Sequence, residues 1–439
     1  MNAAPPSRVA VVIALLAAST TARAQQLTIT PHHADGIYGV GEPVVWDVSV
    51  PAGQAVAGTY SYTVKRDGLA VIGRRTLDLS SGRATIEASL DRPGMLLVEV
   101  RPPPGTTGFH GASKSEVGRV LLGAAVAPRR IRPSSSAPRD FEAFWAAELR
   151  RLDSVPPDPE LTPAESGRPD VALFTIRMNN VDGAHVWGRL ARPAGNDAST
   201  FPALLILQWA SPPYPLQPQW VTDYAAQGWL VLDVEPHDVP PDMPQAFYDA
   251  LPQLIKDYRL IGRTSRDESY FLPMYLGDYR AAEYLANRAD WDGKTLVVMG
   301  TSMGGQQGFA LAGLDPRVTA LIAHAPTGCD LLSPLHGRAA PYPNWDVERP
   351  EVRRTAGYFD AVNFAPRIRA HALISMGFID ETSPPAGIWA AFNELAGPKE
   401  AAPMVGSPHN HLATPEEMLP YTRRAAAWLE TLARGGDPR

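Results

Sequence analysis

The chain has 439 residues, of which 45% are hydrophobic and 20% charged, and this composition excludes a mainly disordered protein. Its 40 basic and 46 acidic residues form no basic run beyond short pairs, which argues against a nucleic-acid partner. The single cysteine, Cys329, excludes an intramolecular disulfide and a cysteine-based metal centre, and we expect its side chain to be buried.

Residues 1–24 have the three parts of a secretory signal peptide. Arg8 supplies a positive charge, residues 9–18 are apolar, and residues 22–24 (Ala-Arg-Ala) fit a cleavage site. The apolar stretch is shorter than the roughly 20 residues that a membrane span needs, and no later uncharged segment reaches that length. We therefore expect a periplasmic or secreted protein that begins near Gln25 and has no membrane span.

Residues 25–126 predict a small antiparallel β-sandwich. Stretches of alternating polar and apolar residues, separated by turn-forming residues, occur at 26–30, 44–50, 58–66, 84–90 and 95–101. A segment rich in proline and serine, residues 127–139, then predicts a linker. The sequence leaves open whether the sandwich binds carbohydrate or serves packing and oligomer contacts.

Residues 140–439 predict an α/β domain, because apolar strands and amphipathic helices alternate along this part of the chain. Buried parallel strands are expected at 203–208, 230–234, 295–300, 320–325 and 370–376. Helices are expected at 141–152, 276–287, 305–314, 388–395 and 415–433. The alternating segments 171–178 and 184–191 predict edge strands. A mainly parallel sheet covered by helices on both faces follows.

One segment carries a motif with a defined chemistry. Residues 296–305 run from an apolar strand through Gly300-Thr301-Ser302-Met303-Gly304 into a helix, which is the nucleophile elbow of α/β-hydrolases. The sharp turn strains the backbone of the serine, and only residues as small as Gly300 and Gly304 leave room for it. The turn also places the Met303 N–H at a helix start, where it can donate to an oxyanion.

A serine hydroxyl is a poor nucleophile until a base accepts its proton, and in this fold an acid and then a histidine follow the serine along the chain. Asp380 comes directly after the expected strand at 370–376, at the carboxyl end where such sites lie. The loop before the last helix holds two histidines, His409 and His411. Either of them fits the position of the base.

A second oxyanion donor is expected in the loop after the strand at 203–208. The donor is a backbone N–H, which we assign to Ala210, with Trp209 as the alternative. The His237-Asp238 pair is either a metal site or second base, or a polar loop at the rim of the cleft.

Other residues in the expected loops and strand ends are open to a packing interpretation. His324 ends a strand, and we expect it to support or pack against the site. The aromatic residues expected in loops around the site, either as sugar-stacking faces or as packing residues, are Trp209, Tyr214, Trp220 and Trp345.

Several longer segments match one family in detail. They include Arg-Asp-Phe-Glu-Ala-Phe-Trp at 139–145, Asp-Tyr-Arg-Ala-Ala-Glu-Tyr-Leu at 278–285, Ala-Gly-Leu-Asp-Pro-Arg-Val at 312–318 and Gly-Phe-Ile-Asp-Glu-Thr-Ser-Pro-Pro at 377–385. With the elbow, these segments resemble the acetyl xylan esterase and cephalosporin-C deacetylase family, carbohydrate esterase family seven. The similarity covers most of residues 133–432.

The resemblance implies a serine esterase that removes acetyl groups from acetylated sugars or xylan-type polysaccharides through an acyl-enzyme. It implies Ser302 as the nucleophile, Asp380 as the orienting acid and His409 as the base, with His411 as the alternative. It implies no metal or organic cofactor, an ester as the substrate, and a homo-oligomer.

The chain departs from the family pattern at three places. Met303 stands where the family has glutamine, and Trp209-Ala210 replaces a Gly-Tyr pair. The family's Arg-Gly-Gln motif is absent from residues 234–241. The alternatives to a sugar deacetylase are a serine peptidase or another ester hydrolase on the same fold, and a noncatalytic sugar-binding protein.

Overall fold

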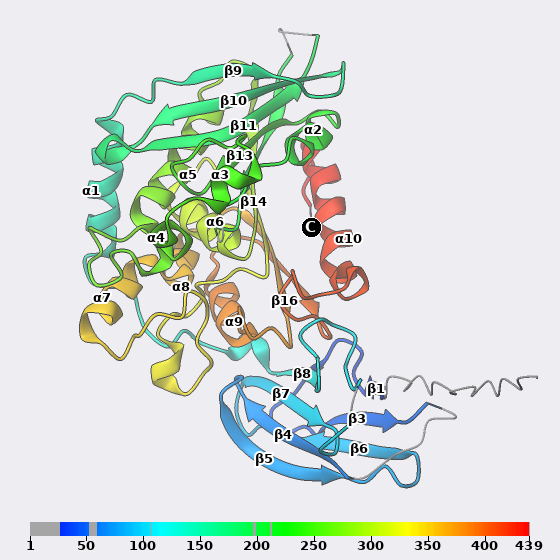
Figure 1. The fold of residues 1–439 in the computed structure, drawn as a ribbon. Helices are drawn as coiled ribbons and strands as arrows, with labels where there is room; N and C mark the ends of the chain where they lie inside the picture. The colour runs from blue at the N-terminus through cyan, green and yellow to red at the C-terminus, as the bar shows by residue number, and fades with distance from the viewer. Residues whose placement is uncertain (1–26, 52–58, 107, 196–198, 211–212, 439) are drawn as a thin grey trace, which may run out of the picture.

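The computed structural model describes residues 27–51, 59–106, 108–195, 199–210 and 213–438. It has a smaller N-terminal part made of two sheets and a larger part in which helices flank one long sheet (Figure 1). The expected signal peptide, residues 1–24, lies outside the described residues. Among the described residues, no helix has the length and apolar character needed to cross a membrane.

The N-terminal part is a β-sandwich whose two sheets share one apolar core. One sheet has the order β1 (Thr28–Pro31), β3 (Val44–Ser49), β6 (Arg83–Ala88). The other has the order β2 (Ile37–Tyr38), β8 (Val120–Val126), β7 (Gly94–Arg101), β4 (Tyr60–Arg66), β5 (Ala70–Leu77). The predicted antiparallel sandwich is confirmed. Among the strands that the structure describes in this part, the short pair β2–β8 alone is parallel.

The larger part is organised by a nine-stranded sheet. Its order is β17 (Lys399–Met404), β16 (His371–Gly377), β15 (Ala320–His324), β14 (Trp291–Thr301), β12 (Phe201–Leu207), β13 (Leu230–Glu235), β11 (His185–Pro193), β10 (Val171–Asn179), β9 (Glu160–Ala164). Strands β17 to β13 run parallel, whereas β11, β10 and β9 pair antiparallel. The predicted α/β-hydrolase sheet is therefore confirmed.

The prediction that residues 171–178 and 184–191 form edge strands is wrong. They correspond to β10 and β11, and the exposed strand β9 pairs with β10 and forms the edge. The sequence of β9, Glu-Leu-Thr-Pro-Ala, is polar and contains a proline. Proline is tolerated on an edge strand, but it hides the strand from a search for alternating hydropathy.

Helices cover both faces of the sheet (Figure 1). Helices α2 (Gln219–Ala225) and α10 (Pro415–Ala433) pack on one face. The other face and its surroundings hold α1 (Phe141–Asp153), α5 (Phe271–Ala286), α6 (Met303–Leu314), α7 (Pro350–Phe359), α8 (Ala361–Phe364) and α9 (Pro385–Glu394). The short helices α3 (Gln245–Asp249) and α4 (Gln253–Lys256) lie in the connection after β13.

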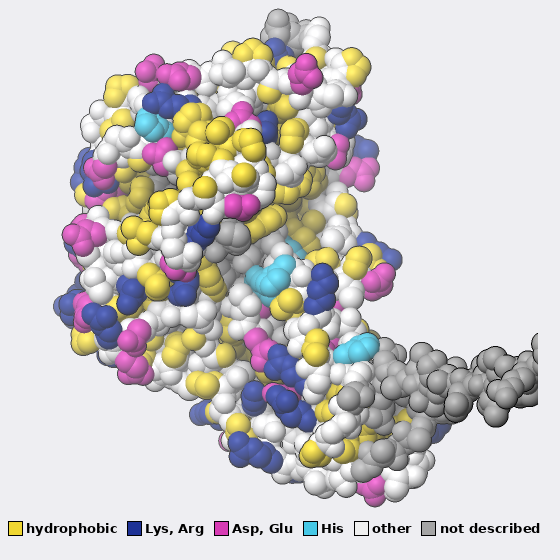
Figure 2. Space-filling view, viewed as in Figure 1, with side chains coloured by type: hydrophobic (Ala, Val, Ile, Leu, Met, Phe, Trp, Pro, Cys, Tyr) yellow, Lys and Arg dark blue, Asp and Glu magenta, His cyan; other side chains and the backbone are white. Residues whose placement is uncertain are grey.

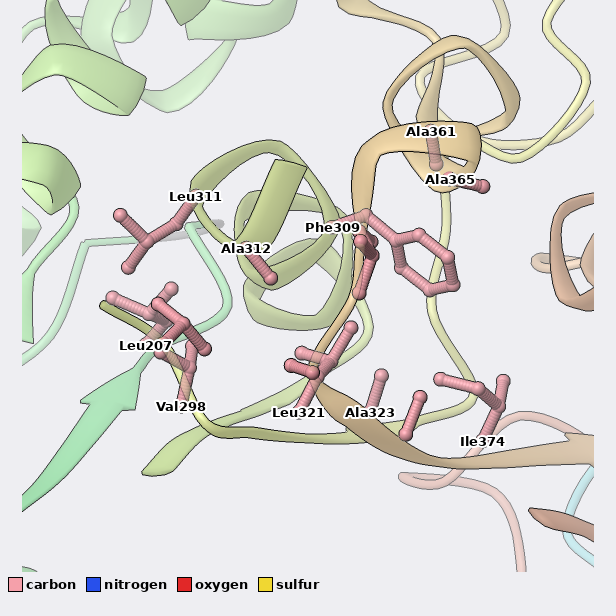
Figure 3. Packing of buried hydrophobic residues seen from close by; sticks show 14 of the residues in the cluster. Leu207, Val298, Phe309, Leu311, Ala312, Leu321, Ala323, Ala361, Ala365 and Ile374 are labelled. Carbon is pink, nitrogen blue, oxygen red and sulfur yellow. The ribbon is translucent and has the colours of Figure 1, made fainter. Parts of the chain in front are cut away.

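The core fixes helix α6, and with it the turn that precedes the helix. Phe309 and Leu311 of α6 are buried against Leu207, Val298 and Leu321 of three neighbouring strands (Figure 3). Alternate residues of the same strands face α2 and α10 instead. Because each such side chain contributes about 1.5–3 kcal/mol when fully buried, this packing holds the start of α6 firmly against the strand ends.

The sandwich packs against the segment that follows β16. A Cβ atom added to Gly123 of β8 would lie 2.5 Å from the Cβ of Phe378, so only glycine permits this close approach. Leu97 and Leu121 form a small apolar cluster with Ile379. The two residues that make these contacts, Phe378 and Ile379, immediately precede Asp380 in the chain.

Candidate active site

Ser302 lies in the sharp turn between β14 and α6. Its backbone has φ 57° and ψ −116°, a conformation that side chains other than glycine rarely adopt. A Cβ atom on Gly304 would lie 1.9 Å from the carbonyl oxygen of Leu207, and one on Gly300 would lie 2.3 Å from the carbonyl group of Gly304. The two glycines therefore allow the turn to sit tightly against β12.

Ser302, His409 and Asp380 form one hydrogen-bonded chain. His409 Nε2 lies 2.8 Å from Ser302 Oγ, and His409 Nδ1 lies 2.7 Å from Asp380 Oδ2. Since a carboxylate can only accept, Nδ1 carries the proton and the Nε2 lone pair faces the serine hydroxyl. The structure thus brings together the three residues that the sequence placed in separate loops.

Asp380 is fixed by its own loop. Its Oδ1 accepts hydrogen bonds of 2.8 Å from the backbone N–H groups of Thr382 and Ser383, which leaves Oδ2 for the histidine. The side chains of Asp380 and His409 are both buried. The carboxylate therefore has fixed partners on both oxygens and cannot rotate away from His409 without losing them.

His411, the alternative base, lies beside His409 with a ring-centroid distance of 5.5 Å. Partial burial and the neighbouring His409 lower the pKa of the His411 imidazole. It borders the pocket that contains Ser302, whereas His409 makes the hydrogen bond to the serine hydroxyl.

Ser302 opens into a pocket of about 590 Å³. Its lining residues are Trp209, Ala210, Tyr258, Ser302, Met303, Tyr342, Thr382, His409, Asn410 and His411. The view in Figure 2 shows histidine side chains in a hollow near the middle of this face, with hydrophobic side chains bordering it. Ala210 and Met303, the residues expected to supply oxyanion donors, both line the pocket.

The sequence did not predict Tyr258, Tyr342 and Thr382 as pocket residues. The hydroxyl groups of Tyr258 and Tyr342 are 2.8 Å apart and form one wall of the pocket. Thr382 follows Asp380 by two residues, so its position was available from the acid motif. The two tyrosines come from connections with no motif of their own.

The two remaining histidines of interest are buried and neutral. Burial lowers the pKa of His324 to about 3, and its ring stacks on Tyr421 with a centroid distance of 4.1 Å. His324 Nδ1 is hydrogen-bonded to Ser375 Oγ at 2.7 Å. Burial also lowers the pKa of His237 to about 4. His324 is therefore the packed histidine that the sequence predicts.

His237 has both ring nitrogens engaged. Nε2 lies 2.7 Å from the carbonyl oxygen of Ala210, and Nδ1 lies 2.9 Å from the hydroxyl of Tyr270. No nitrogen of this ring is left to bind a metal or to act as a second base. Within the described residues, no three His, Cys, Asp or Glu side chains are grouped as a metal site requires.

The predicted aromatic residues separate into two groups. Trp209, Tyr214 and Trp220 cluster beside the pocket, and the Trp209 side chain is 37% exposed. Trp345 is buried and stacks on Phe271 at 5.2 Å, which agrees with the packing alternative for this residue. Cys329 is buried, as predicted.

Comparison with known proteins gives consistent matches. The family model "Acetyl xylan esterase (AXE1)" matches residues 129–429. An acetyl esterase, Axe7A, from Xylanibacter ruminicola is 30% identical over 394 residues, which cover 86% of each chain.

Two solved structures share the fold of the larger part. An acetyl xylan esterase from Paenibacillus sp. R4 superposes with a TM-score of 0.58 and 23% identity, over 68% of this chain and 98% of that chain. Acetyl xylan esterase 1 from Thermoanaerobacterium sp. JW/SL YS485 superposes with a TM-score of 0.53 and 23% identity, over 64% and 92% of the two chains. At this identity the two structures support the fold alone.

Proposed function

Since the chain belongs to the acetyl xylan esterase family and is a carboxylic ester hydrolase, we propose that it is a secreted serine esterase that deacetylates sugars. Its substrates are acetylated sugars or xylan-type polysaccharides, and the reaction passes through an acetyl-enzyme. Ser302 is the nucleophile, His409 the general base and Asp380 the acid that orients the histidine.

In the first half of the reaction, Ser302 Oγ attacks the carbonyl carbon of the acetyl ester while His409 Nε2 takes the hydroxyl proton. The carbonyl oxygen becomes an oxyanion, which the backbone N–H groups of Met303 and Ala210 stabilise. The carbon–oxygen bond to the sugar then breaks. The sugar oxygen leaves with the proton from His409, and the acetyl group stays on Ser302.

In the second half, water enters the site that the sugar has left. His409 takes a proton from the water, and the resulting hydroxide attacks the acetyl carbon. The second tetrahedral oxyanion uses the same two N–H groups. Its collapse releases acetate and returns the proton from His409 to Ser302 Oγ.

The observation that carries this proposal is the pair of hydrogen bonds through His409. A 2.7 Å contact to Asp380 and a 2.8 Å contact to Ser302 orient both ring nitrogens for the transfer. A noncatalytic sugar-binding protein has no need for this arrangement, because sugar recognition does not require a polarised serine.

The test is acetate release from acetylated xylo-oligosaccharides by the mature protein, beside the Ser302→Ala variant. We expect release by the wild type and roughly a 10⁴-fold or greater loss in the variant. Hydrolysis of p-nitrophenyl acetate and of peptide p-nitroanilides is measured alongside. Activity on the simple ester without sugar deacetylation would assign another ester substrate, and cleavage of the anilides would assign a peptidase.

We also propose that residues 1–24 are removed during export and that the mature protein forms a homo-oligomer. The n-region charge, the apolar stretch and the Ala-Arg-Ala sequence support export. Intact-mass measurement of the exported protein is expected to give a chain that begins at Gln25. Light scattering after size-exclusion chromatography measures the oligomeric state, and a monomer at all concentrations would contradict the second proposal.

A further inference from the structure

Side-chain hydrogen bonds fix the backbone of the loop that follows β12. Gln208, Trp209 and Ala210 are consecutive, and the last two line the catalytic pocket. The carbonyl oxygen of each of the three residues accepts a hydrogen bond from a different side chain. Three such bonds on three consecutive peptide groups leave the loop little freedom to rotate.

The first two bonds come from α6 and from the loop itself. Gln307 Nε2 of α6 donates to the carbonyl oxygen of Gln208 at 2.8 Å, and Gln307 is buried. The hydroxyl of Tyr214 donates to the carbonyl oxygen of Trp209 at 2.9 Å and also lies 3.1 Å from Oε1 of Gln208.

The bond from Tyr214 bears directly on the oxyanion donor. The Trp209 carbonyl and the Ala210 N–H belong to the same peptide group. In a planar trans peptide the C=O and the N–H point in opposite directions. Holding the carbonyl toward Tyr214 therefore aims the Ala210 N–H away from Tyr214.

The third bond comes from His237, in the loop after β13. Its Nε2 lies 2.7 Å from the carbonyl oxygen of Ala210, and because a carbonyl only accepts, Nε2 must carry the ring proton. In the neutral ring, Nδ1 is then an acceptor, and the Tyr270 hydroxyl donates to it at 2.9 Å. Burial lowers the pKa of His237 to about 4, so the ring is neutral at neutral pH.

We propose that His237 is a positioning residue of the oxyanion hole, which it acts on through the Ala210 carbonyl, with Tyr214 and Gln307 holding the two preceding carbonyls. The inference rests on the proposed esterase function. It assigns a role to the His237-Asp238 segment, which stands where the sequence lacks the Arg-Gly-Gln motif of the related family. An oxyanion hole stabilises charge well only when its donors are already oriented before the reaction.

The test uses p-nitrophenyl acetate, a trifluoromethyl ketone inhibitor and three variants. His237→Leu removes the donor to Ala210, His237→Gln keeps an N–H donor near the position of Nε2, and Tyr214→Phe removes only the hydroxyl. We expect kcat to fall about 10²-fold in His237→Leu, with KM nearly unchanged, because a misoriented oxyanion donor approaches the roughly 10²–10³-fold cost of a removed one. We expect His237→Gln to recover most of the activity and Tyr214→Phe to lose about tenfold.

The inhibitor separates positioning from a general loss of structure. Its carbonyl forms a tetrahedral adduct with the serine and places a charged oxygen in the oxyanion hole, so its affinity should fall in parallel with kcat/KM. Thermal unfolding shows whether each variant is folded. Tyr214→Phe, which removes only the hydroxyl of a half-buried side chain, tests the positioning of the loop if His237→Leu does not fold.

Failure of the positioning role can be distinguished from failure of the proposed esterase function. A wild-type protein without activity on any ester would contradict the proposed function. An active wild type whose folded His237→Leu and Tyr214→Phe variants keep the wild-type kcat, or lose activity through KM alone, would overturn the positioning role.

Discussion

On one side of Ser302 the functional groups are side chains that hold one another. Asp380 fixes His409, and His409 faces the serine. On the other side, in the loop after β12, the proposed contribution is a backbone N–H group, and side chains such as His237 hold carbonyl oxygens of the same loop. The first side tolerates few substitutions, because the chemistry belongs to particular side chains. The second tolerates different side chains as long as the backbone is held.

This difference accounts for the uneven resemblance along the chain. The acid segment at 377–385 and the elbow keep the family pattern, whereas Trp209-Ala210 and residues 234–241 depart from it. The departing segments follow β12 and β13, on the side where the proposed oxyanion donor is a backbone N–H group. Met303 in place of glutamine is another such departure. The side chain at this position can vary, because the proposed oxyanion donor is the backbone N–H of Met303.

The largest expected loss of activity follows from changes to Ser302, His409 and Asp380. Ser302→Ala removes the nucleophile and should lower acetate release roughly 10⁴-fold or more, with any residual rate coming from binding and the oxyanion hole. Acetate release under saturating substrate measures it, and thermal unfolding provides the control for folding. A variant that retains a tenth of the wild-type rate would place the nucleophile elsewhere.

Asp380→Asn tests whether the carboxylate orients the histidine. Asparagine at this position can present an N–H₂ group to His409 Nδ1, which favours the wrong tautomer of the imidazole. We expect kcat to fall about 10⁴-fold while the substitution leaves the fold intact. The measurement is kcat together with the unfolding temperature, and a loss of less than tenfold would show that His409 keeps its orientation without the acid.

Changes to the side chains that hold the loop after β12 should lower the activity less. The expected loss of about 10²-fold for His237→Leu is smaller than the triad losses, because the N–H donors themselves remain in place and only their orientation is relaxed. Equal losses in His237→Leu and in the triad variants would contradict this expectation, since His237 would then take part in the chemistry rather than support the loop.

Asp233, near the end of β13, should make the free energy of unfolding depend on pH. Burial raises the pKa of its carboxyl from 3.8 to about 8, although a hydrogen bond from Gln208 opposes the shift. The carboxyl is therefore protonated in the folded protein and ionised in the unfolded chain between these two pH values. Its contribution to stability is complete below about pH 4 and is lost as the pH rises toward 8.

Asp233→Asn removes this titration while keeping an acceptor for Gln208. We expect the stability of the variant relative to the wild type to increase by about 1.4 kcal/mol for each pH unit between pH 5 and pH 7.5. Urea unfolding of both proteins across this range measures the difference. A difference that does not change with pH would show that Asp233 is ionised in the folded state.

The smallest expected effect is at His411. Its ring borders the pocket but does not hold the hydroxyl of Ser302, so His411→Ala should change kcat by no more than about threefold. The matched variant His409→Ala should lose activity as completely as Ser302→Ala. A large loss in His411→Ala with activity retained in His409→Ala would exchange the two assignments.

Much of the fold could be predicted from the sequence, because its buried strands and long helices have clear hydropathy patterns. Helix α10 coincides with the predicted range, and the five central parallel strands were all expected. Helix α5 begins at Phe271 rather than at residue 276, since Pro273 in its first turn looks like a helix breaker but is tolerated there. Strand β17 escaped prediction because it begins with two charged residues, Lys399 and Glu400, and contains Pro403.

Some residues of the site could be predicted from the sequence and others could not. The order of serine, acid and histidine is a pattern in side-chain identity, so Ser302, Asp380 and His409 could be found from the sequence. The supports of the oxyanion loop act on carbonyl oxygens, which every residue has. Gln307, Tyr214 and His237 therefore leave no motif, and only their distances to the backbone show what they hold.

The most direct test of the account is covalent labelling of the mature protein with a fluorophosphonate, followed by peptide mapping. Labelling requires a serine activated by its histidine and an oxyanion hole that accepts the phosphoryl oxygen. We expect one adduct, on Ser302, formed rapidly by the wild type and by His411→Ala and slowly by His409→Ala. No adduct, or an adduct on another residue, would contradict it.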